Sequence, residues 1–224
     1  MIGITDTYYL RPEVSNSDLG ELEKYFLPRE QRGDIEAAYR FGNLIDAMIT
    51  EPERCNHFTR TVDGVPFTKE EWELAYKMLK SFRADETCAA FLKLSEGQAV
   101  KSVTMDFNHN GVEFQLLVRC KFDLWMERMQ HGADIKSTTA TTQRQFEASI
   151  AYFNYDRQRA FYMDIAKALG YRCDRDMLIG ISKVNQKIFK LPIKRGDETY
   201  RRGRQKVDEV AFRWWSLFEG FKLP

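Results

Sequence analysis

The 224-residue sequence lacks the features that mark several large classes of protein. Its four cysteines are far apart and include no CxxC pair, which argues against a disulfide framework and against a cysteine-based zinc site. No apolar run approaches the roughly 18 residues of a membrane-spanning helix, and the sequence opens on no basic-then-apolar leader. We therefore expect reduced thiols in a cytoplasmic protein that neither is secreted nor spans a membrane.

The sequence also has almost no net charge. Lys and Arg number 34 and Asp and Glu number 33, which gives a formal net charge of +1. A protein that binds nucleic acid through its overall charge is more basic than this, so such a partner would need a local patch. Hydrophobic residues make up 43% of the chain, which is ordinary for a globular protein.

Hydrophobic periodicity divides the chain into three parts. Residues 1–95 are predicted to be helical, with helices from Ser15 to Phe26 and over 35–49, 69–83 and 86–94, and a break at 28–33. Residues 96–193 are predicted to form strands at 100–107, 112–124, 134–138, 177–182 and 187–191, with helices over 142–153 and 155–169. Residues 194–224 contain a final amphipathic helix. This order predicts a single α/β (α+β) domain, a mixed central β-sheet flanked by helices.

Two acids and one lysine stand out between Val112 and Thr142. Every second residue from Phe114 to Leu124 is apolar, which leaves Asp123 on the opposite face of that strand. Asp134 and Lys136 share one face of the next strand for the same reason. Carboxylates suit Mg²⁺, and a nearby lysine can orient or deprotonate an attacking water. A bare DxK triplet is common, however, and is more often a surface salt bridge.

Four stretches that occur in one order resemble the PD-(D/E)xK nuclease superfamily, in its exonuclease VIII (RecE-like) and RecB-type exonuclease branch. They are RFGNLIDAMITEP, CKFDL, ADIKSTT and FNYDRQRAFYMD, and together they run from about Gly42 to Asp164. Each motif alone is weak, whereas four in the order of the family are specific. The resemblance implies a restriction-endonuclease-like core. The chain departs from the family pattern at Asp46, where the family has a metal-binding histidine.

The resemblance implies a DNA exonuclease that needs Mg²⁺ or Mn²⁺ and digests linear duplex ends in phage-type recombination. Asp123 and Asp134 would bind the metal, with the backbone carbonyl of Ile135 as a further ligand. Lys136 would position or activate the attacking water. A carboxylate at Asp46 also suits Mg²⁺ and would complete a two-metal site, or else the position has lost its metal and Asp46 is a solvated helix acid.

The helix motif of the family supplies Gln158 and Tyr162. By the resemblance, Gln158 would orient the lysine or the scissile region, and Tyr162 would support the same helix face. The two residues are four apart on one helix, so a simple packing pair is the alternative. A basic cluster near the start of the final helix either contacts phosphates or is only a solvated helix start. Its members are Lys194, Arg195, Arg201, Arg202, Arg204 and Lys206.

Other functions stay open at this point. A structure-specific endonuclease on the same fold would cut closed circular DNA, which an exonuclease cannot. A catalytically silent nucleic-acid-binding module would gain no stability from metal. A scaffold that recruits a single-strand annealing protein is a third hypothesis, and it is compatible with catalysis. Family members often form rings around DNA, so a homo-oligomeric ring is a further expectation from the resemblance.

Overall fold

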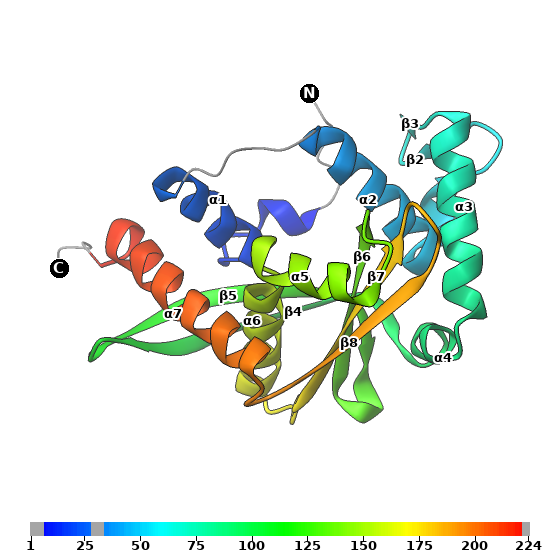
Figure 1. Ribbon diagram of the computed structural model, residues 1–224. Helices are drawn as coiled ribbons and strands as arrows, with labels where there is room; N and C mark the ends of the chain where they lie inside the picture. Colours follow the sequence, from blue (N-terminus) through cyan, green and yellow to red (C-terminus); the bar gives the residue numbers. More distant parts are fainter. Residues whose placement is uncertain (1–6, 28–33, 221–224) are drawn as a thin grey trace.

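A mixed five-stranded sheet forms the centre of the protein in a computed structural model that describes residues 7–27 and 34–220 (Figure 1). The strands lie in the order β4 (Glu96–His109), β5 (Val112–Met126), β6 (His131–Thr138), β7 (Arg175–Ser182) and β8 (Ile188–Lys194). β6 and β7 run parallel, and the other neighbours run antiparallel. The predicted class, a mixed sheet flanked by helices, is therefore confirmed. The predicted break at 28–33 lies outside the described residues.

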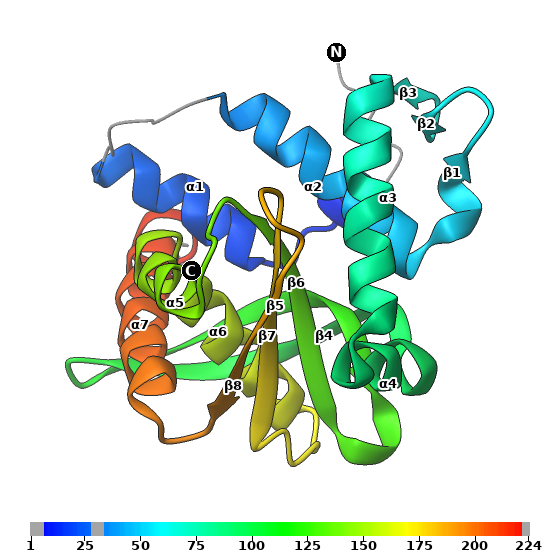
Figure 2. The ribbon, with the colours of Figure 1, turned by 45° about the vertical axis from the view of Figure 1, so that its right-hand side comes forward.

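Helices cover both faces of the sheet (Figure 2). One face carries α1 (Asn16–Phe26), α5 (Gln143–Tyr152), α6 (Tyr155–Ala168) and α7 (Glu198–Phe218). The other face carries α2 (Ile35–Thr50), α3 (Lys69–Ala84) and α4 (Glu86–Leu94). A hydrophobic cluster lies under each group, around Phe122 and Phe161 on the first face and around Ile45 and Ile179 on the second. The sheet therefore contributes side chains to two cores.

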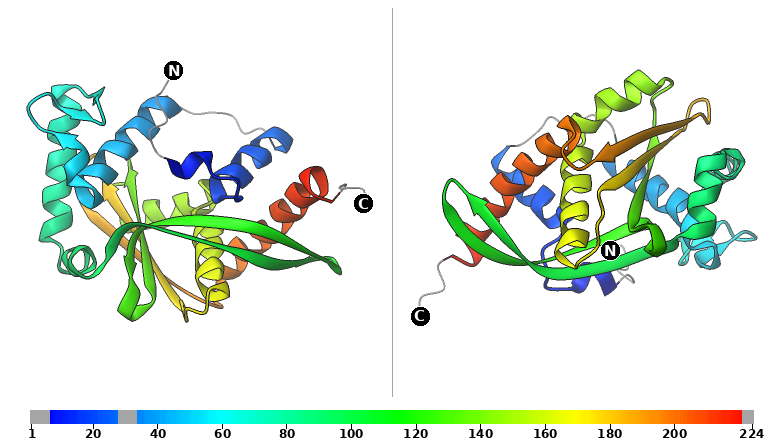
Figure 3. Two further views of the ribbon diagram at one scale, coloured as in Figure 1. Left: turned by 180° about the vertical axis from the view of Figure 1, so that it is seen from behind. Right: turned by 90° about the horizontal axis from the view of Figure 1, so that it is seen from below.

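The long β4–β5 hairpin follows from its turn sequence. Asn110 and Gly111 have φ angles of 53° and 84°, the left-handed conformation that an Asn-Gly hairpin turn requires. The pairing keeps one antiparallel register from His109 and Val112 to Glu96 and Trp125, with a gap at Gln98 and Asp123. Figure 3 shows the hairpin tip extending away from the sheet alongside α7, where the ring of His109 stacks on Phe212 at 4.9 Å.

The predicted helix starts are confirmed by their caps. Ser15 and Thr68 form capping boxes with Asp18 and Glu71, and the side chain of Thr142 accepts a hydrogen bond from the amide of Gln145. α4 occupies the range that the sequence predicts, and α7 lies within residues 194–224, where the sequence predicts the final helix. The packing of α7 against α6 depends on Gly203, since a Cβ there would lie 2.1 Å from the carbonyl oxygen of Asp156.

Two features were not predicted. A small antiparallel sheet follows α2 and comprises β1 (Cys55–Asn56), β2 (Thr61–Val62) and β3 (Val65–Pro66). The segment before α1, which includes the 3₁₀ helix η1 (Thr7–Leu10), lies along β5, where Val14 forms a parallel bridge with Val118. In the described part of the chain, no helix is both long and apolar enough to cross a membrane.

Candidate active site

Asp123, Asp134 and Lys136 come together where β5 and β6 separate. The two strands pair only from Leu124 to Met126. Beyond that point the side chain of Asp123 reaches across, and its Oδ2 accepts a hydrogen bond of 2.7 Å from the amide of Ile135. The Nζ of Lys136 lies 2.6 Å from Oδ2 of Asp134. The sequence-predicted acids and lysine therefore share one site, and Asp123 substitutes for a missing ladder partner of β6.

Asp46 joins this group from α2. It is one position off the buried stripe of that helix and remains partly exposed, as do Asp123 and Lys136, whereas the side chain of Asp134 is only 1% exposed. Burial and the charge of Asp123 raise the pKa of Asp46 well above its usual value. The structure thus brings Asp46 into electrostatic contact with both strand acids, which argues against an isolated, solvated helix carboxylate.

The site carries more negative charge than its lysine balances. Burial and the neighbouring Asp134 raise the pKa of Asp123 to about 6, although Lys136 and the Ile135 amide oppose the shift. Burial lowers the pKa of Lys136, but the charges of Asp134 and Asp123 outweigh it, so the pKa is raised overall. In this arrangement Lys136 is an ammonium, able to donate hydrogen bonds and unable to accept a proton.

Arg159 forms the floor of the site beneath Asp134. Its side chain is fully buried, and one terminal nitrogen lies 3.6 Å from Oδ1 of Asp134 and 3.4 Å from Oδ1 of Asp176. Burial raises the pKa of Asp176 to about 7 in spite of the arginine. The guanidinium lies 4.4 Å from the ring of Tyr162, within the range of a cation–π contact. The sequence analysis did not identify Arg159 and Asp176 as site residues, although Arg159 directly follows Gln158.

Gln158 and Tyr162 occupy the helix α6 next to this floor. Tyr162 is buried, and its ring meets Phe122 edge to face at 5.2 Å. Burial raises the pKa of its phenol, and a hydrogen bond with Gln158 partly opposes that shift. Tyr162 thus packs under the guanidinium of Arg159, which fits the packing alternative as well as a supporting role. The role of Gln158 stays a prediction.

Lys183 lies just beyond the end of β7, next to the end of β6. Its backbone amide donates a 2.7 Å hydrogen bond to the carbonyl of Thr138. Its ammonium lies 4.8 Å from the ring of Phe41 on α2, and burial lowers its pKa. Among the described residues, no carboxylate pairs with it. Lys183 is therefore a half-buried cation that lacks a counter-charge, a feature that the sequence pattern did not reveal.

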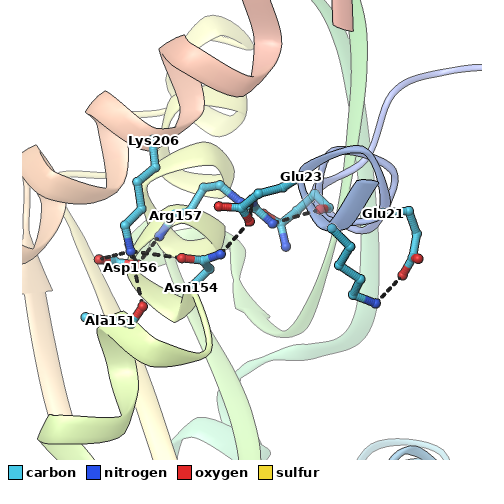
Figure 4. Close-up of polar contacts among 9 residues, drawn as sticks. Glu21, Glu23, Ala151, Asn154, Asp156, Arg157 and Lys206 are labelled. Atoms are coloured by element: carbon cyan, nitrogen blue, oxygen red, sulfur yellow. Dashed lines mark hydrogen bonds and ion pairs between the residues drawn. The ribbon is translucent and has the colours of Figure 1, made fainter. Parts of the chain in front are cut away.

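The basic cluster is mostly neutralised by internal ion pairs. Arg195 and Arg204 contact Asp164 at 2.5 and 3.0 Å. Arg202 and Lys206 contact the fully buried Asp156 at 2.5 and 3.0 Å, and Figure 4 shows Lys206 reaching Asp156 from α7. Of the six members of the cluster, Lys194 and Arg201 are exposed and the other four are partly buried. The structural interpretation of this cluster is favoured over phosphate binding.

The donor set suits a hard divalent cation. In the described residues, no group of three His, Cys, Asp or Glu side chains is arranged so that it could hold a metal ion. Oδ2 of Asp134 is nevertheless buried and accepts no well-directed hydrogen bond, and its neighbour Asp123 has a pKa raised toward neutrality. Asp46, Asp123 and Asp134 place three carboxyl groups around the one ammonium of Lys136, and Asp134 shares the Arg159 guanidinium with Asp176. Oxygen donors in excess of the neighbouring cations suit Mg²⁺ and Mn²⁺, so the residues present fit such a metal.

Comparison with solved structures identified proteins of similar fold. A "putative exonuclease" from Eubacterium rectale superposes with a TM-score of 0.64 at 15% sequence identity, covering 99% of this chain and 87% of that one. A phage-related exonuclease from Haemophilus somnus 129PT gives a TM-score of 0.43 at 11% identity, with 92% and 85% covered, and no argument rests on it. A comparison with curated proteins gave no match.

The family assignment rests on the sequence itself. Residues 22–224 match a family described as a PDDEXK-like domain of unknown function (DUF3799). The match spans the helix of Asp46, both acidic strands and the helix of Gln158. It agrees with the restriction-endonuclease-like core that the four motifs imply. The chain therefore belongs to the PDDEXK-like DUF3799 family, within the PD-(D/E)xK superfamily.

Proposed function

We propose that the protein is a metal-dependent deoxyribonuclease that hydrolyses phosphodiester bonds from the ends of linear duplex DNA. The observation that carries the proposal is the pairing of Asp134 with Lys136 at 2.6 Å, beside an Asp123 whose side chain bonds to the same strand. A group of acids around one ammonium suits a cation on one side and a phosphate on the other. The family and the exonuclease-like fold support the same chemistry.

The acidic residues have one shared task in this proposal. Asp46, Asp123 and Asp134 would hold Mg²⁺ or Mn²⁺, and the carbonyl of Ile135 would be a further ligand. The bound metal supplies a Lewis acid that polarises the phosphate and lowers the pKa of a water.

The lysine and the surrounding helices complete the site. Lys136 donates hydrogen bonds to the attacking water or to a phosphate oxygen, since its raised pKa keeps it protonated before metal binds. Gln158 orients Lys136 from α6. In this proposal Lys183, which has no acidic partner among the described residues, contacts a phosphate of the same strand.

Four further parts of the proposal rest on the family resemblance. They are a role in phage-type recombination, a cytoplasmic location, a single-strand annealing partner and a homo-oligomeric ring. No feature of residues 7–27 and 34–220 favours the partner or the ring over a protein that acts alone.

The proposal is tested with linear and closed circular DNA in Mg²⁺ or Mn²⁺. We expect the linear duplex to be degraded and the circle to survive, and we expect Lys136→Ala and Asp134→Asn to abolish degradation. Lys69→Ala, at an exposed position on α3, is the matched control and should retain activity. Equal cleavage of the circle would favour the endonuclease alternative. Failure to cleave any DNA with either metal would favour a silent binding module.

A further inference from the structure

The turn between α5 and α6 presents a series of aromatic rings next to the candidate lysine. The side chains of Tyr152 and Phe153 are 48% and 56% exposed, and their rings meet edge to face at 4.9 Å. Phe153 stacks on Tyr155 at 5.5 Å with an interplanar angle of 26°. The ring of Tyr155 lies 5.3 Å from Nζ of Lys136. The rings therefore lead without interruption from solvent to the acidic site.

This turn is held firmly by the surrounding helices. Asn154 has a φ of 56°, a left-handed conformation that asparagine adopts more readily than most other non-glycine residues. Its side-chain amide donates a 2.6 Å hydrogen bond to Glu23 on α1, and its oxygen accepts one of 2.9 Å from Lys206 on α7 (Figure 4). Lys206 also contacts the carbonyl of Ala151 at 3.3 Å. Two helices distant in sequence thus fix the position of the rings.

A further aromatic side chain approaches from α2. Tyr39 is 65% exposed and lies near enough to Tyr155 to contribute to the raised pKa of that phenol. Tyr39 and Asp46 are seven residues apart on α2, two turns along one face of the helix. Exposed rings therefore flank the acidic site on both α2 and the α5–α6 turn.

We propose that Tyr152, Phe153 and Tyr155 form a stacking platform for the unpaired bases of single-stranded DNA beside the candidate active site. This inference rests on the proposed function. Every base has a π-face, so rings on a rigid turn bind single strands with little regard to sequence. The net charge of +1 and the internal pairing of most of the basic cluster limit the electrostatic attraction to DNA, so stacking would add binding beyond what Lys136 and Lys183 supply. The platform holds the terminal bases of a frayed or overhanging end next to Lys136.

The test measures binding of a single-stranded dodecamer that contains 2-aminopurine, in EDTA so that no hydrolysis occurs. We expect Tyr152→Ala combined with Phe153→Ala to weaken binding by about 5- to 100-fold and to abolish the fluorescence quenching that stacking causes. The conservative pair Tyr152→Phe and Phe153→Tyr should restore both. Matched controls are Tyr76→Ala on α3 and Phe58→Ala beside the small sheet, which are 51% and 97% exposed and should bind like the parent.

The outcomes separate this inference from the proposed function. If the parent degrades DNA and the double alanine variant, with an unchanged melting temperature, binds the dodecamer within twofold of the parent, the platform is refuted and the nuclease stands. If the parent cleaves no DNA but binds the dodecamer, and the double alanine variant loses that binding, the platform stands and the nuclease is refuted. A loss of equal size in Tyr76→Ala or Phe58→Ala also refutes the platform, because binding would not depend on this turn.

Discussion

Replacing Asp123 by Asn should stabilise the metal-free protein while it abolishes cleavage. The pKa of Asp123 is raised from 3.8 to about 6, because the carboxylate is largely shielded from water and lies beside Asp134. A raised carboxyl pKa means that the folded state binds the proton more tightly than the unfolded state. The contribution to stability is therefore complete below about pH 4 and is lost as the pH rises through about 6.

The magnitude follows from the size of the shift. One pKa unit corresponds to about 1.4 kcal/mol, so the ionisation of Asp123 reduces the free energy of unfolding by up to about 3 kcal/mol between pH 4 and pH 8. Asn cannot ionise, and its side-chain oxygen still accepts the hydrogen bond from the Ile135 amide. We expect Asp123→Asn to exceed the parent in stability by about 1–3 kcal/mol near pH 8 and by little near pH 4.

Urea unfolding in EDTA at several pH values measures this difference, and Asp174→Asn is the control. Asp174 is an exposed carboxylate before β7, so its substitution should change little at any pH. Addition of Mn²⁺ should stabilise the parent more than Asp123→Asn, because the metal supplies the counter-charge that the acids lack. A variant that is less stable than the parent at pH 8, with or without a metal effect, would refute the charge-repulsion reasoning.

Three further substitutions probe the surroundings of the acidic group. Gly42→Ala should stabilise α2 by up to about 1 kcal/mol in thermal melts, because an added Cβ meets nothing within 4 Å. No gain in melting temperature would contradict this expectation. The same substitution should slow cleavage if DNA approaches that open space. Lys183→Ala should weaken DNA binding and reduce the steepness of its salt dependence by about one ion, as titrations at several salt concentrations would reveal, and an unchanged slope would exclude a phosphate contact. Arg159→Met should destabilise the fold by about 3–5 kcal/mol in urea, because it leaves the buried Asp176 without its cation and Asp134 with Lys136 alone, and a loss below about 1 kcal/mol would refute that role.

Local patterns were sufficient to predict most of the secondary structure. Helix caps at Ser15, Thr68 and Thr142 join each capping side chain to a backbone amide three residues along the chain, and the Asn110-Gly111 turn sets the register of the hairpin. The strands β1 to β3 escaped prediction because two residues are too few to display a period.

The site was predictable only in part. Asp134 and Lys136 are two residues apart in one strand, so their common face follows from the sequence. The partnership of Arg159 with Asp176, and the approach of Lys183 to Phe41, join segments that are distant in the chain. No spacing rule links such residues. The pairing of the basic cluster with Asp156 and Asp164 could not be predicted for the same reason. The cluster of cations in the sequence therefore suggested more positive charge available to bind DNA than the folded protein has.

The close packing of α7 on α6 bears on how the protein is made. Asp156 is fully buried, and both of its cationic partners, Arg202 and Lys206, belong to α7. While a nascent chain is still on the ribosome, α7 emerges after α6, so for that interval the Asp156 carboxylate has neither partner. We expect α6, and with it the residues that support Asp134, to reach its final position late in synthesis, so that the incomplete chain lacks a finished candidate site.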